Sequence, residues 1–147
     1  MSFFYLDESS AKQNKVSQLC FNLLRHTPEK SLIAFPSHNH EIFEILYILN
    51  GNLKVTLDKK DYYLSSGDIL IVNPFQLHYG EYPDLNNSVE YLAFTINMRK
   101  WLHIPYISSE LESILDCSAG FTNLVSSTDK LAPEISNLIL NIEKANR

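Results

Sequence analysis

Three histidines and one glutamate lie at spacings that suit a metal or ligand site. His38 and His40 are separated by a single residue, Glu44 follows four positions later, and His78 comes after several polar turns. Residues two apart in an extended strand lie on one face, so one strand through His38, His40 and Glu44 would present all three side chains together. Two or three imidazoles with one carboxylate are good ligands for a divalent first-row metal such as zinc, nickel, manganese or iron.

Apolar residues continue the same face of this stretch, which places the polar groups at one end of an apolar surface. Charged or polar groups sent into an apolar interior need partners or a function. Three interpretations are open for the four residues: a bound metal, the lining of an organic-ligand pocket without metal, or a structural hydrogen-bonded cluster. Tyr79 and Glu90 are further candidates for orienting a ligand. The alternative for both is a place on the rim or on the solvent face.

The elements that must position these residues read as short strands. Alternating or continuous apolar runs of a few residues are separated by turn residues, among them Asn50-Gly51, the SerSerGlyAsp stretch at 65–68 and Asn73-Pro74. Asn-Gly is a hairpin signal, and glycine adopts positive φ without strain. Strands spaced about ten residues apart favour a mainly β sandwich or barrel. Residues 16–26 are ambiguous between strand and helix.

The pattern changes after Met98. Residues 108–117 and 131–147 carry apolar side chains at helical spacing, and Pro133 suits the first turn of a helix. The second of these stretches runs to Arg147 without a stop signal, so we expect the natural chain to continue.

Composition excludes some function classes. The chain has 147 residues with a formal net charge of −5 and no basic stripe, so these residues are a poor candidate for gripping DNA directly. Cys20 and Cys117 lie far apart and form no CxxC pair. The sequence shows neither a signal peptide nor a membrane span, which predicts a cytoplasmic location.

Two motifs carry a family resemblance. The pattern HxHxxxExxxxxxG at 38–51 resembles the first cupin motif, and GDILIVNPFQLH at 67–78 resembles the second. The run from Phe35 to Leu102 resembles the N-terminal sensing domain of AraC-family transcription regulators. Leu32 and Gln76 stand where cupin motifs usually have glycine, and these departures weaken an enzymatic interpretation more than the fold assignment.

The resemblance implies a mainly β fold, a cupin-type β-barrel (jelly roll) followed by C-terminal α-helices. The expected organisation is an N-terminal arm at 1–15, the barrel at 16–98 and a helical segment at 99–147. The last segment is a possible dimerisation region, truncated before a DNA-binding domain.

The resemblance also implies a function without catalysis. The domain would bind a small polar effector, such as a sugar, form a homodimer, and control an attached helix-turn-helix domain, which alone would contact DNA. The implied effector-binding residues are His38, His40, Glu44, His78, Tyr79 and Glu90, and the first four are the possible metal ligands. The alternative is a small free-standing metal-dependent cupin enzyme, an isomerase or dioxygenase.

Overall fold

Two antiparallel sheets and one C-terminal helix make up the described part of the chain. The computed structural model describes residues 21–26, 31–83, 89–97 and 122–145. One sheet has the strand order β1 (Phe21–His26), β8 (Glu90–Ile96), β3 (Phe43–Asn50), β6 (Ile69–Val72) and β9 (Leu124–Val125). The other has the order β2 (Ile33–His38), β7 (His78–Glu81), β4 (Asn52–Leu57) and β5 (Lys60–Ser65). Helix α2 spans Ala132–Ala145.

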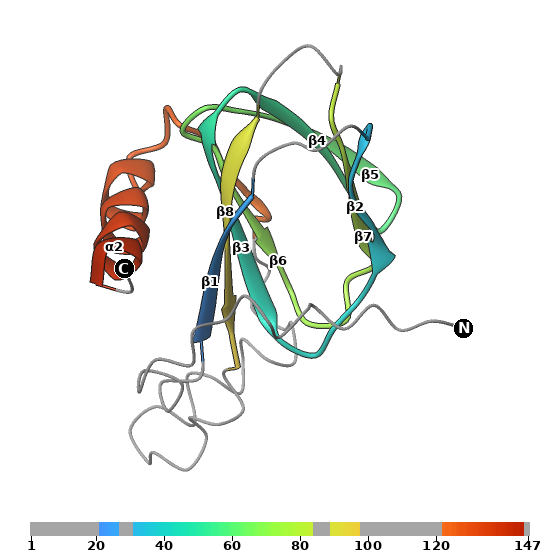
Figure 1. The fold of residues 1–147 in the computed structure, drawn as a ribbon, viewed down its shortest axis with the longest axis horizontal. Coiled ribbons are helices and arrows are strands. Elements are labelled where there is room, and N and C mark those ends of the chain that lie inside the picture. The colour runs from blue at the N-terminus through green and yellow to red at the C-terminus, as the bar shows by residue number, and fades with distance from the viewer. Residues whose placement is uncertain (1–20, 27–30, 84–88, 98–121, 146–147) are drawn as a thin grey trace.

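The two sheets face each other (Figure 1). Buried apolar residues from both sheets form one core cluster. Strand β4 shows why: Leu53, Val55 and Leu57 alternate onto the inner face and are buried, whereas Lys54 points outward and contacts acidic residues. The architecture confirms the predicted mainly β, cupin-like fold. The ambiguous stretch at 16–26 contributes strand β1, which pairs with β8. The helix expected at 108–117 lies outside the described residues.

The turns before and after β4 make different connections. Asp58 and Lys59 both have positive φ, 45° and 72°, and join β4 to its neighbour β5 in a tight hairpin. Gly51, with φ 82°, joins β3 to β4, which belong to different sheets. The hairpin expected at Asn50-Gly51 is therefore wrong, because β3 already pairs with β6 and β8 on its two edges.

The segment before α2 is fastened to the edge of the five-stranded sheet. Strand β9 pairs with β6. The buried Asp68 carboxylate accepts hydrogen bonds from the backbone N–H groups of Ser65 and Ser127. A Cβ at Gly67 would approach the Ser127 Cβ to 2.9 Å, so glycine permits this close contact.

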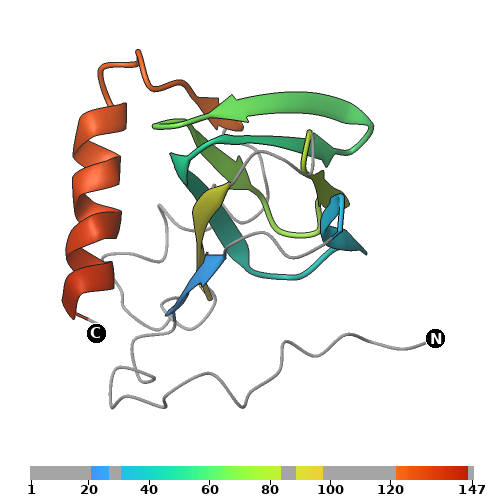
Figure 2. The ribbon, with the colours of Figure 1, turned by 45° about the horizontal axis from the view of Figure 1, so that its top comes forward.

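Helix α2 follows this segment and runs beside the five-stranded sheet, on the side away from the four-stranded sheet (Figures 1 and 2). Ala132 and Ile139 are buried, while Leu138 is exposed, as is Leu131 just before the helix. In the described part of the chain, no helix is long and apolar enough to cross a membrane.

Candidate functional site

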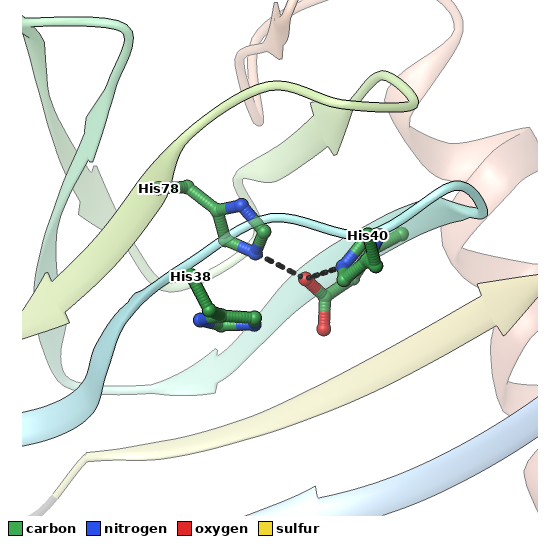
Figure 3. Close-up of side chains that lie close together, drawn as sticks. His38, His40 and His78 are labelled. Atoms are coloured by element: carbon green, nitrogen blue, oxygen red, sulfur yellow. Dashed lines mark hydrogen bonds and ion pairs between the residues drawn. The ribbon is translucent and has the colours of Figure 1, made fainter. Parts of the chain in front are cut away.

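The structure brings His38, His40, Glu44 and His78 together at one end of the sandwich. One ligand atom from each side chain lies within 4.8 Å of all the others. His38 ends β2 and pairs directly with His78, which begins β7. Glu44 comes from β3 in the opposite sheet, and His40 lies in the connection between β2 and β3. Figure 3 shows the rings of His40 and His78 turned toward one carboxylate, with His38 beside them.

The route by which these residues meet differs from the expected one. They do not share a single extended strand, because β2 ends at His38 and β3 starts at Phe43 in the other sheet. The chain passes from one sheet to the other between β2 and β3. This connection brings the side chains of His38, His40 and Glu44 close together. The prediction of a shared inner face holds only within β3, where Glu44 lies on the side of the buried Leu46.

Each imidazole is oriented by a main-chain carbonyl. The Nδ1 atoms of His38, His40 and His78 lie 2.7, 2.8 and 2.9 Å from the carbonyl oxygens of Pro36, Ile42 and Gln76, respectively. A carbonyl oxygen only accepts, so each Nδ1 must carry the proton and donate it. The Nε2 atom of each neutral ring is then left with a free lone pair, which is the arrangement typical of metal-ligating histidines.

The Glu44 carboxylate faces two of these Nε2 atoms. Its Oε2 lies 3.0 Å from Nε2 of His78 and 3.4 Å from Nε2 of His40. An ionised carboxylate and the Nε2 of a neutral, Nδ1-protonated ring can both only accept. A proton or a metal cation must therefore lie between them. This donor chemistry fits a divalent cation held by three histidine nitrogens and one carboxylate.

The electrostatics of the site favour the ionised Glu44 and neutral His38 that a metal cation needs, but they also favour the protonated form of His40, whose proton a metal would have to displace. Burial raises the pKa of Glu44, but the hydrogen bonds with His40 and His78 outweigh it and lower the pKa to about 2. Burial lowers the pKa of His38 below its usual value of 6.5. Burial also acts to lower the pKa of His40, yet its hydrogen bond with Glu44 raises it overall. At neutral pH Glu44 is thus ionised and His38 neutral.

The aromatic ring of Phe35 packs against one side of the cluster, a contact that the sequence analysis did not predict. The Phe35 ring lies edge-on to the rings of His38 and His78, with centroids 5.9 Å away in both cases. Gly80 makes room for it, because a Cβ there would overlap the Phe35 ring. A glycine inside a strand often marks such a close approach, and this was the available signal.

Tyr79 and Glu90 are not brought to the cluster. Strand alternation turns Tyr79 to the face opposite His78, and it pairs with Thr56. Glu90 pairs with Asn50 at the far end of β3 from Glu44, whose partner on β8 is Thr95. Their roles as effector-binding residues stay predictions.

Comparison with solved structures places the fold among cupins. The Schizosaccharomyces pombe Cnp3 cupin domain is 12% identical, with a TM-score of 0.51, and covers 57% of this chain and 61% of that one. The plu4264 protein from Photorhabdus luminescens is 16% identical, with a TM-score of 0.50, covering 63% and 73%. At these identities the likeness shows the fold alone.

A predicted oxalate decarboxylase from Thermotoga maritima is 28% identical, with a TM-score of 0.46, and covers 50% of this chain. The present chain spans 64% of that protein, less than two thirds of its length. No curated protein sequence matches this chain.

A family comparison completes the assignment. The profile of the AraC-like ligand binding domain matches residues 21–146, which include every described strand and helix α2. The chain therefore belongs to the AraC-like ligand-binding domain family.

Proposed function

We propose that this domain senses a small polar molecule at the cluster of His38, His40, Glu44 and His78, with a divalent metal held by the same four residues. The observation that supports this most directly is the shared orientation of the imidazoles. Three main-chain carbonyls hold the proton of each ring on Nδ1, so the Nε2 atoms are the ones left to bind a cation, which takes the place of a proton between them and Glu44. An ionised carboxylate completes the set.

The four side chains suit zinc, nickel, manganese or iron, since mixed imidazole and carboxylate sets bind all of these. When bound, such an ion supplies a Lewis-acidic centre for an oxygen atom of the ligand. The protein's own contribution is to hold the carboxylate ionised, orient the rings and exclude water on the Phe35 side. A sugar or another molecule rich in hydroxyl groups fits this chemistry.

The regulatory part of the proposal follows from family membership. Occupancy of the site would shift the population between arrangements of the domain and so control an attached helix-turn-helix domain, which would make the DNA contacts. The net charge of −5 agrees with DNA contacts made elsewhere. We propose a cytoplasmic homodimer, with the exposed Leu131 and Leu138 beside and on α2 as candidate contact residues.

A metal-dependent cupin enzyme, an isomerase or dioxygenase, is the second candidate function. It is favoured by the completeness of the donor set, because three histidines and one glutamate suit catalytic as well as sensing sites. The two functions differ in the fate of the small molecule. A sensor returns its ligand unchanged, whereas an enzyme converts it.

Thermal unfolding with and without metal tests the proposal. Zinc, nickel, manganese and iron(II) should each be added to chelator-treated wild type, Glu44→Gln and Glu90→Gln. We expect zinc at a hundred times its Kd to stabilise the wild type by about 2.7 kcal/mol. Glu44→Gln should lose this effect, with at least about a 100-fold loss of zinc affinity, the upper range for outer-shell partners. Glu90→Gln is the matched carboxylate control for metal binding, and its response to added metal should equal that of wild type.

A screen of polyols and sugars on the metal-loaded protein follows, with the ligand analysed by NMR after incubation. A stabilising ligand recovered unchanged supports the sensor, and a converted ligand supports the enzyme. Equal stabilisation of wild type and Glu44→Gln by every metal would overturn the assignment of the metal to this cluster.

A further inference from the structure

A chain of hydrogen bonds leads from the candidate site to the segment that precedes α2. It begins at His78, whose Nδ1 donates to the main-chain carbonyl of Gln76 at 2.9 Å. The His78 ring is fully buried, and its orientation is set by the Gln76 carbonyl at Nδ1 together with the Glu44 carboxylate near Nε2.

The side chain of Gln76 binds within its own loop and to two other segments. Its Oε1 accepts hydrogen bonds from the Asn73 N–H and from Asn123 Nδ2, both at 2.9 Å. Its Nε2 donates to Asp58 Oδ2 at 3.2 Å. The loop between β6 and β7 is thus fixed by directional bonds to the β4–β5 turn and to the residue just before β9.

Asn123 is the member of this chain that belongs to the C-terminal segment. Its Nδ2 also donates to the Ile71 carbonyl at 2.8 Å, and its own carbonyl accepts from the Ile71 N–H at 2.7 Å. Strand β9 begins at the next residue and α2 follows after a short turn. A displacement of this segment would therefore move the Asn123 Nδ2 donor that holds the Gln76 side chain.

We propose that Gln76 and Asn123 are positioning residues for His78, and that they couple occupancy of the site to the docking of the segment 123–131 on the barrel. The proposal rests on the function proposed above and names the residues that transmit it. Coupling is reciprocal: if ligand binding tightens the segment, loosening the segment must weaken binding by the same factor.

The first test measures zinc affinity by calorimetry and amide hydrogen exchange on the full chain. Zinc should slow exchange at the Ile71 N–H, which reports the docking of Asn123, and at the Ser127 N–H, which Asp68 accepts. Asn123→Ala should weaken zinc binding about 2- to 30-fold, the range for residues that modulate coupling without touching a ligand. The zinc effect on exchange at Ser127 should disappear.

Asn123→Asp is the shape-preserving companion, because it removes both side-chain donors but keeps the volume. It should weaken zinc binding as Asn123→Ala does. Thr128→Ala is the matched control, since the described contacts of this exposed residue reach only Ser126 in its own segment. A purely structural role for Asn123 predicts lower stability but unchanged zinc affinity of the folded protein, and this result would overturn the coupling.

The outcomes separate this inference from the proposed function. If zinc binds the wild type and leaves exchange at 123–131 unchanged, the coupling is wrong and the metal site stands. If zinc does not bind, the metal assignment fails, and the coupling is judged on the metal-free protein. In the metal-free protein, Glu44→Gln replaces the carboxylate beside His78 Nε2 but leaves Gln76 unchanged. If the coupling exists, this variant should change amide exchange at Ile71 and Ser127. Exchange rates equal to those of wild type would reject the coupling.

Discussion

The inner face of β3 contains two regions with opposite chemistry. Glu44, at its beginning, lies among imidazoles and is ionised at neutral pH. Leu46 and Ile48, one and two alternations further, are 1% and 0% exposed and belong to the apolar core. The same backbone geometry thus presents a carboxylate to a polar cluster and branched aliphatic side chains to a close-packed interior.

The two regions are stabilised in different ways. The apolar region depends on area removed from water, which has no preferred direction. The polar region depends on directional bonds, because every imidazole has its Nδ1 partner and the carboxylate has two ring neighbours. A buried ion is tolerated only with such partners. Damage to the first region should therefore appear as lost stability, and damage to the second as lost binding.

The largest expected effect on stability comes from the apolar region. Leu46→Ala removes a fully buried side chain and should lower the free energy of unfolding by about 2–5 kcal/mol. Urea denaturation of the metal-free protein measures this loss. Zinc affinity of the folded variant should stay close to wild type, because Leu46 makes no bond to the cluster. A more than about tenfold loss of zinc affinity would show that the two regions are not separable.

An intermediate effect is expected where the regions meet. Gly80→Ala would push a Cβ into the Phe35 ring, which lies against His38 and His78. Overpacking of this kind costs about 1–3 kcal/mol, and the displaced ring should also weaken zinc binding. Adding Phe35→Leu should recover part of both losses. If the double variant is as impaired as the single one, the contact with Phe35 is not the cause.

The smallest effect is the pH dependence of the polar region in the metal-free protein. The pKa of Glu44 is about 2 in the folded state against 4.5 ordinarily, so its stabilising contribution is full above pH 4.5 and is lost toward pH 2. His40 has a folded pKa above 6.5, so its contribution is full below pH 6.5 and is lost as pH rises through the folded value.

The stability difference between wild type and Glu44→Gln should therefore be greatest between pH 4.5 and pH 6.5. We expect a difference on the order of 1 kcal/mol there, the size of a typical net hydrogen bond. Chemical denaturation with chelator, carried out within this range and also below and above it, measures the pH dependence of the difference. A difference that does not vary with pH would mean that the Glu44–His40 contact does not control either ionisation.

The sequence alone determined most of the fold and the identity of the cluster. Strict alternation predicted β4, since burial of one strand face has a period of two. Short apolar runs between turn residues predicted β5, β6 and β8. Leu131–Ile142 predicted α2, where the period is 3.6. The types of His38, His40, Glu44 and His78 were enough to predict a metal-competent set.

Only the tertiary structure decided how the strands are shared between the sheets and how the site is assembled. The residues of a turn do not determine whether the strands before and after it pair with each other, because pairing depends on whether the edges of those strands already have partners. At Asn50-Gly51 the strand before the turn, β3, pairs with β6 and β8, so β4 joins the other sheet. The meeting of His38 and Glu44 across the sandwich depends likewise on the crossing of the chain. The carbonyl partner of each imidazole lies only two residues away in sequence. The contacts of His78 with Glu44 and of Gln76 with Asn123 instead join residues 34 and 47 positions apart, and no local pattern predicts contacts over such a separation.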